Sequence, residues 1–458
     1  MPQYFKQIDI GDRIMEFPLK KHHLTTSQII IIGFALVILI GSMILMLPIS
    51  SRGEGGTSFS DALFTATSAV CVTGLVVHDT ATYWSGFGQA VILVLIQIGG
   101  MGVVTVAVFI AMVSGRKIGL MQRSTMQEAI AAPQVGGIVR LTGFILKMTF
   151  LIECIGMLLM MPVFISHFGV GKGIWYSVFH SISAFCNAGF DLMGVKSNFS
   201  SLTFFVSQPV INLTIMLLII IGGIGFLTWD DIITKRHHIK KYRMQSKVIL
   251  VTSAVLIVFP AVYFFFGELA GYPMGKRILA SLFQAVTPRT AGFNTVDLTL
   301  MTGAGQAIII FLMLIGGSPG STAGGMKTTT LAVMLASARS VFHRKNQAGF
   351  FGRRISEDAI RNAAAILLMY LVLFLAGGII ISRVEALPLS DCLFETASAI
   401  GTVGLTLGIT TSLGQVSRAI LIFLMYMGRV GGLTLIFAAT STTKSYTSKL
   451  PQEKITVG

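Results

Sequence analysis

The stretch SAVCVTGL at residues 68–75 decides the fold, because related versions of it occur four times along the chain. The later copies are SAFCNAGF at 183–190, VTPRTAGF at 286–293 and SAIGTVGL at 398–405. Each copy is rich in small or hydroxylated residues and ends in a glycine followed by an apolar residue. These glycines are Gly74, Gly189, Gly292 and Gly404, at intervals of 115, 103 and 112 residues. Self-similarity at such a period predicts four comparable structural units.

Each copy follows a short amphipathic segment that contains a phenylalanine. From that phenylalanine to the glycine is ten residues in the first, second and fourth copies and nine in the third, so the alignment upstream of Thr287 stays open. The segments are too short to span a bilayer and too apolar for exposed loops. We therefore predict re-entrant pore segments, each a half-helix followed by an extended return, near residues 60–73, 175–188, 277–291 and 389–403.

The composition excludes an ordinary soluble protein. The mean hydropathy is +0.79, and 53% of the residues are hydrophobic while 12% are charged, against about a quarter charged in soluble domains. The four cysteines have no metal-type spacing and favour neither a zinc site nor a disulfide framework. Apolar runs long enough to cross a bilayer predict eight spans, near 26–48, 86–113, 143–166, 205–227, 248–267, 304–337, 362–382 and 415–438.

The predicted fold class is an all-α polytopic membrane protein, in which eight transmembrane helices form four pseudo-fourfold membrane–pore–membrane repeats around a central pore. Units of two spans share one orientation, which disfavours inverted repeats. The repeats are 26–113, 143–227, 248–337 and 362–438. The remaining segments are an N-terminus (1–25), three loops (114–142, 228–247 and 338–361) and a C-terminus (439–458).

The distribution of lysine and arginine sets the orientation, because short cytoplasmic loops carry an excess of both. Five segments together hold 23 of the 34 lysines and arginines in the chain. They are 1–24 with 4, 114–142 with 4, 228–247 with 6, 338–361 with 6 and 439–458 with 3. These segments, both termini included, are expected in the cytoplasm. The net charge of +15 is then a positive-inside bias and a docking surface, and no nucleic-acid partner is expected.

A cation filter is predicted at the four glycine-ended loops. Non-helical backbone at membrane depth is tolerated only where it is buried in protein or lines water, and rings of carbonyl oxygens can replace a cation's hydration shell. Glycine accepts the positive φ that aims successive carbonyls to one side. One such glycine would more often be a packing residue, but four in matched context favour a filter. Its residues are Val70, Cys71, Val72, Thr73 and Gly74; Phe185, Cys186, Asn187, Ala188 and Gly189; Arg289, Thr290, Ala291 and Gly292; and Ile400, Gly401, Thr402, Val403 and Gly404.

The second span of every unit carries a further matched glycine motif: GGMG at 99–102, GGIG at 222–225, GGSPG at 316–320 and GRVG at 428–431. Close packing or a bend explains the glycines. Neither explains Arg429, which stands where the other units have glycine. A charge in mid-span is costly and usually functional; the alternative is that Arg429 snorkels to the cytoplasmic surface.

The third unit departs further, because GGSPGSTAGG at 316–325 has five glycines and a proline that will not hold a helix. A phosphate-binding loop is excluded, since Met326 separates Gly325 from Lys327 and no strand precedes. We predict a broken span whose middle obstructs the conduit below the filter, faces Arg429 and moves to admit ions. This gate loop comprises Gly316, Gly317, Ser318, Pro319, Gly320, Ser321, Thr322, Ala323, Gly324 and Gly325.

Four more residues stand out, and three of them have two possible roles. Arg289 either pins the third loop by pointing away or places a fixed cation beside the filter. Asp61 and Asp391 are expected to be helix N-caps, with attraction of cations at the mouth as the alternative. His180 is expected to be a packed pore-helix residue.

Together these features resemble the Trk/Ktr/HKT superfamily of potassium transporters. The resemblance rests on the four membrane–pore–membrane units with one filter glycine each, the string RTAGF at 289–293, the glycine-rich break and Arg429. Eight spans and a short N-terminus make the chain most similar to the bacterial Ktr membrane, or pore-forming, subunit. The resemblance covers nearly the whole chain.

The resemblance implies that backbone carbonyls at Gly74, Gly189, Gly292 and Gly404 bind K⁺, and that 316–325 is an intramembrane gate with Arg429 below the filter. It also implies a homodimer in the membrane lipid of a bacterial cell, sodium-dependent potassium uptake and a cytosolic ring of RCK-type nucleotide-binding regulatory subunits. No organic cofactor is expected in this chain.

The expected function is potassium uptake down the electrochemical gradient, without enzymatic activity. A coupled secondary carrier for another cation or solute is the alternative, and it would need paired ionisable groups at the midplane. Glu153 is the one acidic residue with a central place in a span. A membrane enzyme is a second alternative, for which no cluster of His, Asp, Glu and Cys can be assembled from the sequence.

Overall fold

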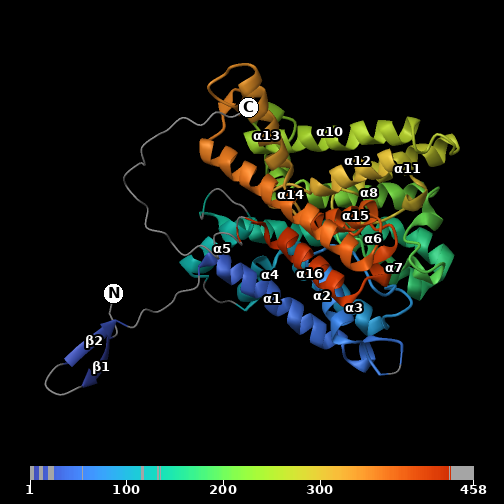
Figure 1. The fold of residues 1–458 in the computed structure, drawn as a ribbon, viewed down its shortest axis with the longest axis horizontal. Helices are drawn as coiled ribbons and strands as arrows, with labels where there is room; N and C mark the ends of the chain where they lie inside the picture. The colour runs from blue at the N-terminus through green and yellow to red at the C-terminus, as the bar shows by residue number, and fades with distance from the viewer. Residues whose placement is uncertain are drawn as a thin grey trace.

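A computed structural model describes residues 25–432, except 54, 115–117, 131–133 and 135, together with 5–9, 14–18 and 434. This part of the chain is largely helical (Figure 1). Within it four helices are long and apolar enough to cross a membrane, and they are the first span of each predicted repeat. They are α1 (Thr26–Leu45), α6 (Ile138–Phe168), α10 (Met244–Phe266) and α14 (Glu357–Glu385).

Each long helix packs against a shorter helix that ends at a glycine-ended loop. These pore helices are α2 (Phe59–Val70), α7 (Val170–Phe185), α11 (Met274–Val286) and α15 (Leu389–Gly401). All four phenylalanines that mark them in the sequence are fully buried. The pore helices therefore sit inside the bundle, between the long helices and the loops.

The prediction that Asp61 and Asp391 cap the pore helices is wrong. Ser58 caps α2 and accepts a hydrogen bond from the backbone N–H of Asp61, and α15 begins directly after Pro388. Both helices thus start about a turn earlier than expected. The two aspartates lie in the first turn, where a carboxylate faces the positive end of the helix dipole.

The second spans of the first and second repeats are bent, as in one of the two explanations that the sequence offered for their glycine motifs. The breaks at Gly102 and Gly225 (φ +85° and +92°) bend the chain by 96° and 99°. The helices on either side of these bends are α3 (Gly86–Met101) and α4 (Val103–Val113) in the first repeat, and α8 (Pro209–Gly223) and α9 (Phe226–Lys235) in the second. In the third repeat the second span is divided into α12 (Gly303–Leu314) and α13 (Thr328–Phe342). In the fourth repeat α16 (Gln415–Val430) ends at Gly431.

The glycine motifs of these spans allow close contact with the pore helices. A Cβ added at Gly99, Gly222 or Gly428 would overlap the carbonyl oxygen of the residue near the end of its own unit's pore helix. Those carbonyls belong to Val70, Phe185 and Ile400. Small residues are needed wherever two backbones approach this closely.

Two short hairpins are exceptions to the predicted all-α fold. Strands β1 (Phe5–Asp9) and β2 (Ile14–Pro18) pair antiparallel near the N-terminus, and β3 (Gly349–Phe350) pairs with β4 (Arg353–Arg354). Between β3 and β4, Phe351 and Gly352 both have positive φ, the turn that two-residue hairpins favour. Hydrophobic periodicity cannot detect strands this short.

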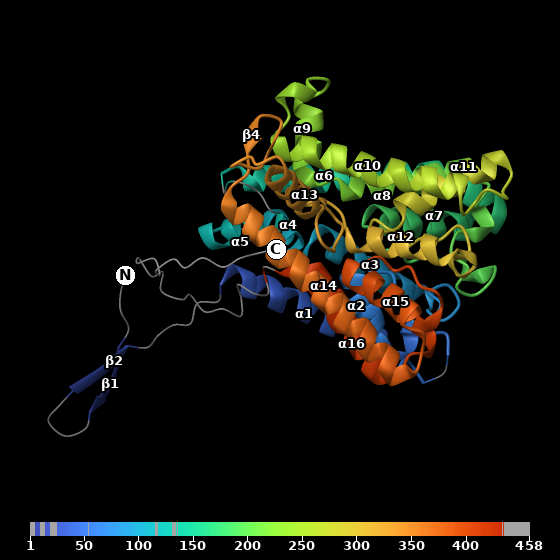
Figure 2. The same ribbon diagram turned by 45° about the horizontal axis from the view of Figure 1, so that its top comes forward.

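The basic segments gather at one end of the helix bundle. Figure 2 shows α5 (Leu120–Ile130), α9, α13 and the β3–β4 hairpin at the end opposite α7 and α11, and α5 and α13 can be followed at the same end in Figure 1. The short 3₁₀ helices are η1 (Pro48–Ser50), η2 (Met193–Val195), η3 (Thr203–Phe205), η4 (Ile239–Lys241), η5 (Leu298–Leu300) and η6 (Ile409–Ser412). The segment 439–458 and most of 1–24 lie outside the described residues.

Candidate ion pathway

The four glycine-ended loops share one backbone conformation. Each glycine has a positive φ, and so does the residue two positions before it. The values are +51° and +92° for Val72 and Gly74, +58° and +69° for Asn187 and Gly189, +65° and +78° for Thr290 and Gly292, and +51° and +92° for Thr402 and Gly404.

The left-handed residues before the glycines are strained. Val72, Thr290 and Thr402 are β-branched, and such residues seldom adopt this conformation. Strain of this kind persists only where the surrounding structure holds it, and it gathers at functional sites. The sequence carries no signal of it, because isolated valine and threonine favour extended backbone.

The loops close into a ring in which each contacts the next. A Cβ added at any of the four glycines would lie within 2.6 Å of a carbonyl oxygen in the following loop. Gly74 faces Ala188 and Gly189 faces Ala291, while Gly292 faces Val403 and Gly404 returns to Thr73. The structure therefore brings the four predicted loops together, in chain order, around one axis.

The carbonyl oxygens of Thr73, Ala188, Ala291 and Val403 accept no hydrogen bond from any residue that the structure describes. Buried carbonyls normally have a partner. A ring of free carbonyl oxygens is a chemical match for a partly dehydrated monovalent cation.

Hydroxyl side chains tie each loop to the end of its pore helix. Ser68 and Ser398 accept hydrogen bonds from the backbone N–H groups of Gly74 and Gly404, at 3.1 and 3.0 Å. In the other two loops, Ser183 and Thr287 donate to the carbonyl oxygens of Phe190 and Phe293, at 2.7 and 2.6 Å. Thr287 therefore corresponds to the three serines, and the one-residue shortening of the third loop falls between Thr287 and Gly292.

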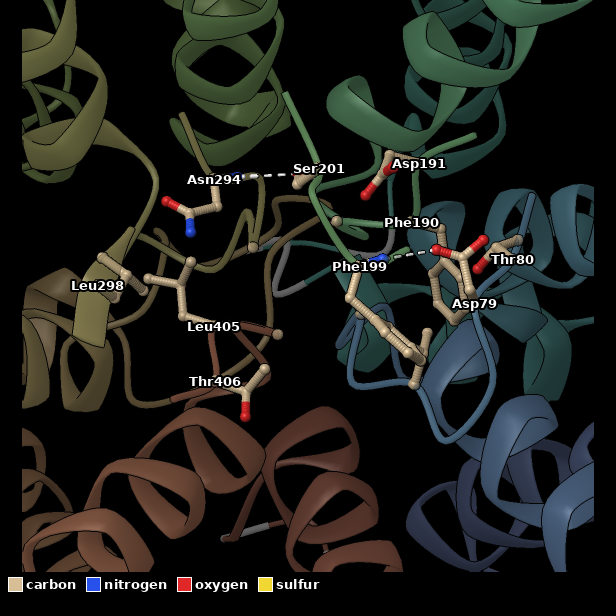
Figure 3. Close-up of a pocket in the computed structure, with 15 residues that line it drawn as sticks. Asp79, Thr80, Phe190, Asp191, Phe199, Ser201, Asn294, Leu298, Leu405 and Thr406 are labelled. Atoms are coloured by element: carbon tan, nitrogen blue, oxygen red, sulfur yellow. Dashed lines mark hydrogen bonds between the residues drawn. The ribbon is translucent and has the colours of Figure 1, made fainter. Parts of the chain in front are cut away.

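A cavity of about 110 Å³ lies on one side of the ring and is lined by the glycines of all four loops (Figure 3). Asp79 and Asp191 also line it. Asp79 accepts a hydrogen bond of 2.8 Å from the backbone N–H of Phe199, which joins the loops of the first two units. Burial, with a further contribution from the charge of Asp79, raises the pKa of Asp191 to about 6. Neither aspartate was predicted, although each follows a filter glycine closely in the sequence.

Arg289 points out of the ring, which favours the interpretation that it pins the loop. Its guanidinium donates a hydrogen bond of 3.0 Å to the hydroxyl of Ser253 on α10, and 5% of its surface is exposed. His180 is fully buried and contacts the carbonyl oxygen of Tyr176 and the backbone N–H of Leu192. It is a packed residue, as expected.

The gate loop lies in the break between α12 and α13 and contacts the second unit. The backbone N–H groups of Ser318 and Thr322 donate to the carbonyl oxygens of Gly223 and Gly222, at 2.9 and 3.2 Å. The hydroxyl of Thr322 donates to the side-chain oxygen of Asn187, at 3.0 Å. Because Asn187 belongs to the second filter loop, the gate loop is in direct contact with the ring.

Arg429 bridges the gate loop to the first unit. Its guanidinium donates to the carbonyl oxygens of Thr322 and Gly99, and to that of Gly100 at 3.2 Å. The side chain does not snorkel away from the bundle. Its charge is instead spread over three backbone carbonyls, which compensates part of the cost of burying it.

Lys327 is a second cation at the gate loop that sequence reasoning missed. Its ammonium donates to the carbonyl oxygens of Ala323 and Gly324, at 2.8 and 3.2 Å. A single lysine inside an apolar run was the available signal.

Comparison with known proteins gives one consistent result. The TrkH family model, described as a cation transport protein, matches residues 18–449. The potassium/sodium uptake protein NtpJ of Enterococcus hirae is 39% identical, over 97% of this chain and 100% of that protein. The Ktr system potassium uptake protein B of Bacillus subtilis is 40% identical, over 92% and 94%.

A solved structure shares the fold. The potassium transporter TrkH from Vibrio parahaemolyticus superposes with a TM-score of 0.71 at 18% sequence identity. The superposition covers 93% of this chain and 87% of that one.

Proposed function

The chain belongs to the TrkH family of cation transport proteins, which are ion transporters and not enzymes, and on that premise we propose that it is the pore-forming subunit of a Ktr-like potassium uptake system. Potassium ions would cross between the four filter loops, drawn inward by the negative membrane potential. The proposal is supported by the similarity to NtpJ, a potassium/sodium uptake protein, and to a Ktr system potassium uptake protein.

The single observation that carries the proposal is the ring of four left-handed glycines, each against a carbonyl of the next loop. Backbone carbonyl oxygens from four loops around one axis can replace the water molecules around K⁺ without any charged side chain. The flanking residues differ between loops, so we expect fewer matched rings and weaker selectivity than in a symmetric potassium channel.

Residues 316–325 would form the gate, and the hydrogen bonds of Arg429 would hold it closed. The proposal is supported by the hydrogen bonds of Thr322 to Asn187 and of Arg429 to Thr322, because a loop so placed lies against the filter. Transport would require the loop to release these contacts.

A homodimer, a sodium requirement and a cytosolic ring of RCK-type nucleotide-binding subunits complete the proposal. They are inferred from the resemblance to the Ktr membrane subunit. The names of the similar Ktr proteins describe parts of a system, and the gathering of basic segments at one end of the bundle offers a surface for an acidic partner.

Growth of a potassium-uptake-deficient bacterium at limiting potassium tests the function. The chain, produced with a Ktr-type cytosolic subunit, should restore growth, and sodium should increase the rescue. A tagged copy purified from these cells should retain the cytosolic subunit. Absence of rescue by a chain that is present in the membrane would contradict the proposal, whereas rescue without co-purification would contradict only the partner.

Asp191 should make potassium affinity depend on pH. A carboxyl with a pKa of about 6 is mostly charged at pH 7 and mostly neutral at pH 5, so the cavity beside the ring loses a negative charge on acidification. The apparent KM for potassium should rise about two- to fivefold between pH 7 and pH 5, the scale of one exposed charge interaction. Asp191→Asn should show the high KM at both pH values; an equal pH effect in that variant would contradict the prediction.

A further inference from the structure

Glu153 is a buried carboxyl group that the proposed pathway does not use. It lies in the middle of α6, and 5% of its surface is exposed. Its neighbours Phe150, Leu151 and Ile155 on the same helix are each about half exposed, as expected of a lipid-facing surface. Carboxyl groups within membrane spans are costly and usually functional.

A chain of hydrogen bonds leads from Glu153 to the second filter loop. The side-chain amide of Gln97, on α3, donates to Glu153 Oε1 at 3.0 Å. The other end of the same amide, Gln97 Oε1, accepts from the thiol of Cys186 at 3.7 Å, a weak hydrogen bond. Cys186 directly follows α7 and belongs to the second filter loop.

Close packing fixes both ends of this chain. A Cβ added at Gly100 would lie 2.5 Å from Cys186 Sγ, so α3 lies directly against the thiol. The hydroxyl of Ser181, on α7, donates to the backbone carbonyl of Glu153 at 2.6 Å. The carboxyl, the amide and the thiol therefore join two helices of the second unit, its first span α6 and its pore helix α7, to α3 of the first unit.

We propose that Glu153 is a positioning residue of the ion filter, which sets the orientation of Gln97 and thereby holds Cys186 and the second filter loop in place. An acceptor at Glu153 Oε1 draws the NH₂ group of Gln97 toward it and leaves the amide oxygen for the thiol. Without that acceptor the amide can rotate and present its NH₂ group to Cys186 instead. This inference rests on the proposed function of the four loops as a potassium filter.

The test is the ratio of potassium to sodium uptake in membranes that contain equal amounts of each variant. Glu153→Leu removes the acceptor and should lower the ratio about threefold or more, the scale of one net hydrogen bond. Glu153→Gln keeps an acceptor oxygen and should restore the wild-type ratio. Thr149→Val is the matched control, because Thr149 is a fully buried hydroxyl without a hydrogen-bond partner among the described residues, about one turn away on α6; its ratio should not change.

Gln97→Leu provides a second route if Glu153→Leu fails to reach the membrane. It should lower the ratio to a similar extent, and the double variant should be no worse than either single variant, because both changes break one chain. An unchanged ratio in Glu153→Leu, a defect in Glu153→Gln as large as in Glu153→Leu, or additive effects in the double variant would each overturn the inference. If only these results fail while the filter glycines remain essential, the proposed filter stands; if the wild type takes up no potassium, the proposed function itself fails.

Discussion

Gly404→Ser should lower the initial rate of potassium uptake by at least about tenfold. The serine Cβ would overlap the carbonyl oxygen of Thr73. A non-glycine residue in the left-handed region adds about 1–2 kcal/mol of backbone strain. To relieve the overlap, the first loop would have to move away from the axis, which breaks the ring of oxygens. Gly292→Ser should act in the same way, because its Cβ would overlap the carbonyl oxygen of Val403.

Gly408→Ser is the matched control for this prediction. Gly408 lies four residues further along the same connection, has a φ of +99° and has no atom within 4 Å of an added Cβ. The backbone strain is therefore similar, but no filter carbonyl is displaced. Potassium uptake should stay within about twofold of wild type, since a surface change away from such features costs little. Equal uptake by the Gly404 and Gly408 variants would contradict the filter.

Arg429→Ala should raise potassium flux, because the guanidinium holds the gate loop through Thr322 and the first unit through Gly99 and Gly100. A hydrogen bond from a charged donor contributes about 1.5–3 kcal/mol. Loss of about 3 kcal/mol from the closed state would shift the equilibrium toward the open state by about 100-fold. We expect at least about a tenfold increase in flux from proteoliposomes without the cytosolic subunit, where the wild-type gate is mostly closed.

Two arginine variants control for this result. Arg418→Ala removes another arginine of α16, one that pairs with Asp61 at 2.7 Å and not with the gate loop, and it should leave flux unchanged. Arg429→Lys keeps the charge but loses the forked geometry, so its flux should be intermediate. Shortening of residues 317–324 should also raise flux. Unchanged flux in both Arg429→Ala and the shortened loop would remove the gate role.

Local sequence features were sufficient for the parts of the structure that depend on hydrophobic length and backbone freedom. The four long apolar helices, the pore helices that carry a buried phenylalanine and the helix break before residue 316 all follow from composition over a short window. Arg429 could be singled out for a related reason, since a charge inside an apolar span needs a partner. Its partners could not be named, because they lie on two other units of the chain.

What only the tertiary structure decided depends on contacts between distant segments. The order of the loops around the ring, the left-handed conformation of Val72 and Thr402 and the role of Asp191 cannot be read from their own neighbourhoods in the sequence. The loop order is fixed by carbonyl oxygens of the neighbouring loops, and the charge of Asp79 in the first unit contributes to the raised pKa of Asp191, so the partners lie about a hundred residues away or more. The sequence by itself predicted four comparable glycine-ended loops that have to be buried in protein or line water, because unpaired backbone cannot face lipid. The packing of the units determined which carbonyl each glycine faces, and thereby the geometry of the proposed filter.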